Sequence, residues 1–92
     1  MSRQEILEEL KAVLAPYTMD KQVLSNMTDD TEFIRDLKIN SANLIDIIID
    51  AEDKYDIEID ADSAEKIHNA GSCIDVIMDK MKEKIWQAQA MI

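Results

Sequence analysis

The chain has 92 residues and a formal net charge of −10 at pH 7. A chain of this length has room for one domain, residues 1–92, with one small core, which excludes a large enzyme with an enclosed active site. Residues 28–65 hold 13 acids and 3 bases and carry the whole imbalance. Such a field repels phosphate backbones and anionic lipids and attracts basic proteins, so we expect no nucleic-acid partner.

The composition favours helices, because the chain has one Gly, one Pro and few aromatic residues. Its single cysteine, Cys73, can form no internal disulfide, and no cluster has zinc-ligand spacing, so we expect no metal site. No apolar stretch approaches the roughly 20 residues of a membrane span. Residues 1–5 lack the apolar run of a secretory signal, so we expect a cytoplasmic protein, with an organelle matrix left open.

The first helix is expected at about residues 3–15. Ser2 and Glu5 have the spacing of a capping box, and apolar residues then recur at helical intervals up to Pro16. The stretch 16–38 is too long for a bare loop and too apolar for a disordered linker. We interpret it as a connection anchored to the core by its hydrophobic residues, with short helical turns within it.

The second main helix is expected from Ser41 to Tyr55, with Asn40 or Ser41 as its cap. Its predicted core stripe is Leu44, Ile48, Ala51 and Tyr55, widened by Ile45 and Ile49. Its predicted polar face consists of Asn43, Asp46, Asp50, Asp53 and Lys54.

A short helix is expected at about residues 62–67, ending before Gly71, which should break the helical pattern. Ser72 should then cap a last helix whose apolar stripe is Ile74, Ile77, Met78, Met81 and Ile85, with Trp86 against the edge of the bundle. The sequence therefore predicts an all-α fold, a small four-helix bundle of three main helices and one short helix.

The sequence contains no constellation for catalysis, and we expect a protein that is not an enzyme. The single histidine, His68, has no acid–base partner at a useful spacing and is interpreted as an exposed turn residue. Cys73 is interpreted as a small buried core residue. The acids from Asp56 onward suggest a calcium loop, but Ala61 stands where Gly is needed and Ile67 where Glu is needed.

Ser41 is the residue that stands out. A serine at the start of a helix is usually a cap and nothing more. Here, however, the partly positive helix end would favour a phosphate on the serine oxygen, and the acidic helix that follows would guide a basic partner to the same place. An attachment point and a docking surface would then lie together.

Residues 31–60, TEFIRDLKINSANLIDIIIDAEDKYDIEID, resemble the signature region of acyl carrier proteins. That region has an aromatic–aliphatic pair, Asp-Leu-Gly, two further residues, a modified Ser, and an acidic helix ending in an aromatic residue and an Asp/Glu–Ile segment. The resemblance needs no gap from about Phe33 to Ile77. The matching positions are Phe33, Asp36, Leu37, Ser41, Asp46, Glu52, Tyr55, Ile59 and Ile67.

The resemblance implies that Ser41 receives 4′-phosphopantetheine from coenzyme A, through a separate Mg²⁺-dependent phosphopantetheinyl transferase, and that the thiol of this arm carries acyl groups as thioesters. It implies a monomer whose acidic helix meets basic patches on acyl-transferring and chain-modifying enzymes. The docking positions would be Asn43, Asp46, Glu52 and Asp53. The acyl chain would lie among Phe33, Ile48, Ala51, Ile59, Ala64, Ile67 and Val76.

The chain departs from the family pattern around the serine. The usual Asp-Ser-Leu is Asn40-Ser41-Ala42, and the usual Gly of Asp-Leu-Gly is Lys38. These changes indicate a specialised carrier in fatty-acid, polyketide or other lipid synthesis. Two alternatives stay open: an aminoacyl or peptidyl carrier, and an unmodified acidic adaptor that binds basic proteins.

Overall fold

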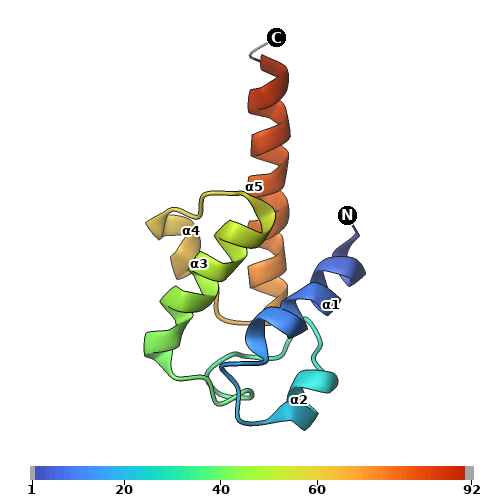
Figure 1. The fold of residues 1–92 in the computed structure, drawn as a ribbon, viewed down its shortest axis with the longest axis vertical. Coiled ribbons are helices and arrows are strands. Elements are labelled where there is room, and N and C mark those ends of the chain that lie inside the picture. Colours follow the sequence, from blue (N-terminus) through green and yellow to red (C-terminus); the bar gives the residue numbers. More distant parts are fainter. Residues whose placement is uncertain (1, 91–92) are drawn as a thin grey trace.

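The computed structural model describes the backbone of residues 2–90 and the side chains of residues 2–83. Within this part the fold is all-α, as predicted (Figure 1). The long helices are α1 (Arg3–Leu14), α3 (Leu44–Tyr55) and α5 (Ala70–Ala90). The short ones are α2 (Lys21–Ser25), α4 (Ala61–Glu65) and a 3₁₀ turn, η1 (Ser41–Asn43), that leads into α3. Helix α2 lies in the stretch where short helical turns are expected.

The capping box at the start of α1 is confirmed. The Ser2 hydroxyl accepts a hydrogen bond from the Glu5 amide at 3.2 Å, and the Glu5 carboxylate accepts one from the Ser2 amide at 3.3 Å. These bonds hold the pKa of Glu5 below its usual value. Beyond this cap, α1 buries one apolar face and ends at Leu14, shortly before Pro16.

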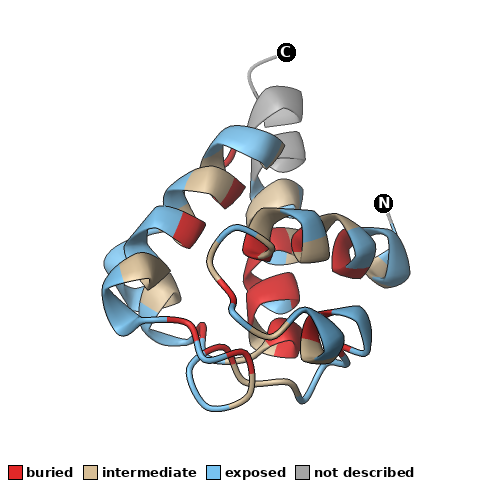
Figure 2. Cartoon of the chain, turned by 60° about the horizontal axis from the view of Figure 1, so that its bottom comes forward, coloured by how far each residue is buried: buried red, intermediate tan, exposed pale blue. Residues whose placement is uncertain are grey.

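The core lies where α1, α3 and α5 meet, and Figure 2 shows the buried residues gathered on the facing sides of these helices. The non-helical loop 28–40 also supplies core residues, Phe33, Leu37 and Ile39. Cys73 is buried among them, as predicted, and burial raises the pKa of its thiol to about 12. The connection 16–38 is thus anchored by its hydrophobic residues, as the sequence indicates.

The start of the last helix differs from the prediction. Helix α5 begins at Ala70 and is capped by Asn69, whose side-chain oxygen accepts a hydrogen bond from the Ser72 amide at 2.7 Å. Ser72 lies inside the first turn, where its hydroxyl accepts from the Asn69 amide at 3.1 Å. The prediction that Ser72 is the cap is therefore wrong, because Asn is an equally good cap three residues earlier.

Gly71 does not break a helix but lies in the first turn of α5. Its amide donates to the Asp29 carbonyl at 2.8 Å, and a Cβ added at this position would stand 3.0 Å from that same oxygen. A glycine is required here because the loop 28–40 crosses α5 at close range. The predicted helix at 62–67 is observed one or two residues earlier, as α4, with Asp60 as its cap.

The predicted core stripe of α3 needs one correction. Ile45 and Ile49 are 65% and 47% exposed, whereas Ile47, which the prediction left out, is 1% exposed. At roughly 100° per residue, Ile47 lies beside Ala51 and Leu44, and Ile49 lies on nearly the opposite side of the helix. Because Ile45, Ile47, Ile48 and Ile49 are the same residue type, the sequence alone does not show which of them face the core. The predicted positions of Ile85 and Trp86 fall outside the described side chains.

Lys38 adopts a left-handed backbone conformation with φ of 57°. Its neighbours Leu37 and Ile39 are both buried, so the chain must reverse direction between two anchored side chains. Left-handed geometry disfavours any residue with a Cβ, so a glycine would adopt this conformation at less cost than Lys38 does.

We predict that Lys38→Gly stabilises the fold by about 1 kcal/mol, because glycine adopts a positive φ without steric cost. Urea denaturation of wild type and variant measures the difference. Lys38→Ala is the matched control, since it removes the same charge and keeps the Cβ. If Lys38→Gly is no more stable than Lys38→Ala, the backbone at residue 38 is not strained.

Candidate functional site

Ser41 is exposed at the first position of η1. The cap is its neighbour Asn40, whose side-chain oxygen accepts a hydrogen bond from the Ala42 amide at 2.9 Å. The Asn40 carbonyl accepts from the Asn43 amide at 2.9 Å. Among the described residues the Ser41 hydroxyl has no hydrogen-bond partner. Of the two capping residues that the sequence allows, Asn40 therefore has that role, and the hydroxyl of Ser41 is available for chemistry.

The backbone that leads to Ser41 is fixed at two points. The Leu37 carbonyl accepts a hydrogen bond from the buried Thr18 hydroxyl at 2.6 Å. Two residues later the Ile39 amide donates to the Phe33 carbonyl at 3.0 Å, and the Ile39 side chain is buried. Ser41 is thus an exposed residue that follows directly on an anchored segment. Such an attachment point holds a constant position relative to the bundle.

The charges around Ser41 would suit an attached phosphate. The stretch 37–45 contains no acid, although acids are dense on both sides of it. The start of a helix adds a partial positive charge. The exposed hydroxyl, the helix start and this gap in the acidic segment together fit a phosphate ester on Ser41.

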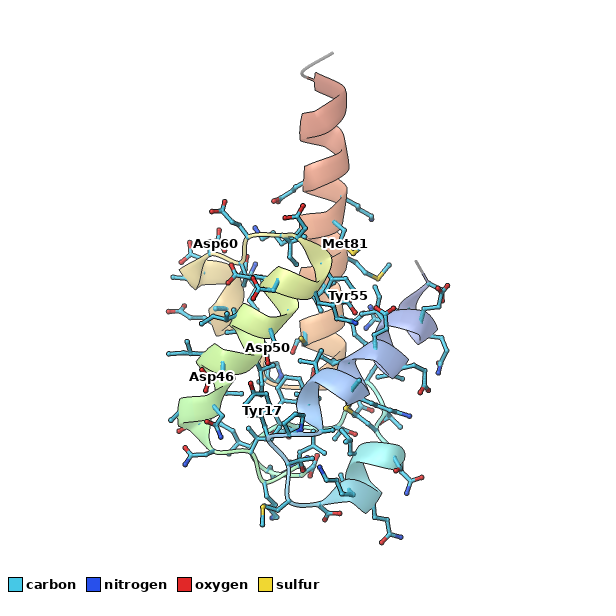
Figure 3. All side chains as sticks on the ribbon, viewed as in Figure 1. Tyr17, Asp46, Asp50, Tyr55, Asp60 and Met81 are labelled. Carbon is cyan, nitrogen blue, oxygen red and sulfur yellow. The ribbon has the colours of Figure 1, made fainter. Side chains whose placement is uncertain are left out.

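Of the predicted docking residues, Asp46 and Asp53 are exposed on α3, and Asn43 is half-buried at its start. Glu52 is half-buried, and its carboxylate accepts a hydrogen bond from the Ile59 amide at 2.8 Å, so it serves the loop between α3 and α4. Figure 3 shows Asp46 on the outer side of α3 and Asp50 facing Tyr17. The Tyr17 hydroxyl donates to Asp50 at 2.7 Å.

The exposed pair Ile45 and Ile49 is a feature that the sequence analysis assigned to the core. These residues are four apart, so they lie on one face of α3. On a helical projection that face adjoins the one that holds Asp46 and Asp53. A helical projection centred on Ile47 and Ala51 would have identified the pair. Together the four residues form a mixed apolar and acidic surface, which we call the α3 outer face.

The residues predicted to line an acyl pocket mostly lie in one apolar cluster. Phe33, Ala51, Ile67 and Val76 are buried in the core, and the half-buried Ile48 and Ile59 pack against it. Ala64 is half-buried on α4. Two surface hollows touch the edge of this set, one of about 250 Å³ that includes Val76 and one of about 290 Å³ that includes Ile59. Charged and polar residues line most of both hollows.

Two tyrosines attach α3 to the N-terminal part of the chain. Besides the Tyr17 bond to Asp50, the Tyr55 hydroxyl donates to the Glu9 carboxylate on α1 at 2.8 Å. The bond to Asp50 is the main cause that raises the pKa of Tyr17, and burial is the main cause for Tyr55. Both tyrosines therefore stay protonated; Tyr55 holds α3 against α1, and Tyr17 holds it to the turn that follows α1.

The remaining sequence interpretations concern metals and membranes. Within the described residues no group of three His, Cys, Asp or Glu side chains is placed to hold a metal ion. In the same part of the chain, no helix is both long enough and apolar enough to cross a bilayer. His68 is exposed, as expected of a turn residue.

The fold is a small helical bundle of a kind that points to a carrier protein rather than a catalyst. No protein-family model matches the sequence, and no curated protein matches it. The structure is similar to that of the acyl carrier protein from Enterococcus faecalis, with a TM-score of 0.69. The two chains are 25% identical, and the match covers 87% of this chain and 99% of the other. The chain is therefore acyl-carrier-protein-like in fold, and the resemblance found in its sequence is confirmed.

We predict that Asn40→Ala lowers the free energy of unfolding by about 1 kcal/mol, because it removes the helix cap, whereas Ser41→Ala changes it little. Asn40→Asp keeps an oxygen for the Ala42 amide and should restore most of the loss. Chemical denaturation of the three variants measures these differences. A larger effect of Ser41→Ala than of Asn40→Ala would show that the serine is the cap.

Proposed function

We propose that this protein carries acyl intermediates as thioesters on a 4′-phosphopantetheine arm attached to Ser41. The observation that supports the proposal best is the state of Ser41, an exposed serine with an unpartnered hydroxyl at the start of η1, the turn that leads into α3, in an acyl-carrier-protein-like fold. The arm, once attached, supplies a terminal thiol that forms the thioester. Cys73 is buried and has a raised pKa, so it is unsuited to that role.

Attachment is a phosphoryl-transfer reaction at the Ser41 hydroxyl. The serine oxygen attacks the phosphorus of coenzyme A that carries the pantetheine, and a new oxygen–phosphorus bond forms. The pyrophosphate bond breaks, and adenosine 3′,5′-bisphosphate leaves with the electron pair. A base of the transferase takes the hydroxyl proton. The exposed position of Ser41 lets a separate enzyme reach it, and the anchored residues before it hold the oxygen in place.

The α3 outer face is the proposed docking surface for the transferase and for the enzymes that use the cargo. Asp46 and Asp53 would attract basic patches and speed association, and Ile45 and Ile49 would add apolar contact once the surfaces meet. Of the proposed docking residues, Asn43 lies nearest to Ser41, at the end of η1. Because Glu52 already bonds to the Ile59 amide, we assign it a smaller part in docking than Asp46 and Asp53.

The acyl chain would occupy the apolar cluster that contains Phe33, Ala51, Ile67 and Val76, widened as α3 and α4 move apart. The tyrosine bonds hold α3 to the other side of the bundle, against α1 and Tyr17. We propose a monomer that works in the cytoplasm or an organelle matrix, in fatty-acid, polyketide or other lipid synthesis.

We predict that incubation with coenzyme A and a broad-specificity phosphopantetheinyl transferase adds the mass of one phosphopantetheine unit, and that Ser41→Ala abolishes this gain. Intact-mass spectrometry measures it. Ser25→Ala is the matched control, since Ser25 is another exposed serine and its loss should leave the gain intact. Modification of Ser41→Ala would contradict the site, and no gain in wild type would favour the adaptor alternative.

We predict that Asp46→Lys lowers the kcat/KM of the transferase for this carrier roughly fivefold at low salt, and less as salt screens the charges. The variant should melt close to wild type, because Asp46 is exposed. The measurement is a set of initial rates across ionic strengths, with thermal melts of each protein.

Asp30→Lys is the control for this prediction, because Asp30 is also exposed, lies outside α3, and undergoes the same reversal of charge. A loss of rate in Asp46→Lys alone would assign docking to the α3 outer face. Equal losses in both variants would mean that the total charge of the protein, and not the position of Asp46, governs association.

A further inference from the structure

Lys38 is the one charged residue in the stretch 37–45 that surrounds Ser41. The nearest acids in sequence are Asp36 and Asp46. Asp36 is already engaged, because its carboxylate accepts hydrogen bonds from the Glu32 amide at 2.8 Å and from the Arg35 side chain at 3.2 Å. Asp46 lies in the first turn of α3, farther from Ser41 along the chain than Lys38 is. The charge closest to Ser41 in sequence is therefore positive, in a chain whose net charge is −10.

The fold tolerates Lys38 at a cost. Its φ of 57° disfavours a residue with a Cβ, and both of its neighbours are buried, so a change of this backbone conformation would disturb the core. In the described part of the chain its ammonium group forms no hydrogen bond or ion pair. Its charge contributes only weakly to lowering the pKa of Asp36, after the hydrogen bonds to that carboxylate and its other neighbours. Contacts within the fold thus do not account for a lysine at this position.

We propose that Lys38 is a positioning residue for the arm, and that its ammonium group pairs with the phosphodiester that joins 4′-phosphopantetheine to Ser41. This proposal rests on the proposed function. A phosphodiester carries one negative charge, and a lysine ammonium is a suitable partner for phosphate at an exposed site. Lys38 and Ser41 are three residues apart, and the segment between them is held by the buried Ile39 and the Asn40 cap.

The pairing would have two consequences. It would restrict the root of the arm, so that the thiol samples fewer directions from the start of α3. It would also offset the negative charge that the arm adds to an already acidic segment. Asn40 contributes to the same effect, because a carboxylate at that position would compete with the phosphate for the ammonium group.

The test compares wild type, Lys38→Ala, Lys38→Arg and the control Lys82→Ala, which removes an exposed lysine on α5. Each protein is converted fully to its phosphopantetheine form with excess transferase, and conversion is checked by intact mass. Two properties are then measured: the ³¹P NMR shift of the phosphodiester at low and high salt, and the melting temperature with and without the arm.

We expect the ³¹P resonance of Lys38→Ala to differ from that of wild type at low salt and to coincide with it at about 500 mM salt, where an exposed pair is screened. Attachment of the arm should lower the melting temperature about 2 °C more in Lys38→Ala than in wild type. Lys38→Arg should restore both properties, and Lys82→Ala should match wild type. Because each variant is compared with its own unmodified form, the strain at residue 38 cancels.

Two results would overturn the proposal, and they are distinguishable. If wild type gains the arm but Lys38→Ala shows the same ³¹P shift and the same change in melting temperature, Lys38 does not pair with the phosphodiester, and the carrier function stands. If wild type gains no mass, the proposed function fails, and the role of Lys38 fails with it.

Discussion

The arrangement of this protein depends on the burial of Phe33 at the centre of a loop that has no helix of its own. Phe33 is fully buried, and its amide donates to the His68 carbonyl at 3.1 Å. Just before Phe33 the loop bonds to the start of α5, where the amides of Ala70 and Gly71 donate to the carbonyls of Thr31 and Asp29. The loop 28–40 thus joins the start of α5 to the start of α3. Without that anchor Ser41 would be at the end of a mobile connection.

Two sides of helix α3 have different roles: one packs in the core, and the other is exposed. One side is held by the core through Ile47 and Ala51 and by hydrogen bonds from Tyr17 and Tyr55. The α3 outer face leaves two isoleucines and two aspartates exposed to water, and an exposed apolar pair rimmed by acids is typical of a surface that a partner covers. Because its buried side holds α3 in the bundle, the exposed isoleucines of the α3 outer face need no contact within the fold.

The sequence predicts well the features that rest on local chemistry. The capping box at Ser2, the anchoring role of Phe33 and the burial of Cys73 follow from residue type and spacing. The errors occur where a choice depends on tertiary packing. Ile45, Ile47 and Ile49 are chemically alike, so only the position of α1 and α5 decides which is buried. By residue type Gly71 predicts a helix break, and only the crossing of the loop at Asp29 shows why a glycine lies in the first turn of α5.

The conformation of Lys38 is a further property that the sequence does not predict, because it depends on two buried neighbours, on the Thr18 hydroxyl bond to the Leu37 carbonyl and on the Ile39 amide bond to the Phe33 carbonyl. In the segment 38–41, the residues that stabilise the fold differ from the residue proposed to be modified. Asn40 provides the cap, Ile39 provides the anchor, and Ser41 is left with no structural task. Because Ser41 contributes little to the fold, it is free to be modified and exposed. The strain in this segment is confined to Lys38, the residue whose side chain the fold does not use.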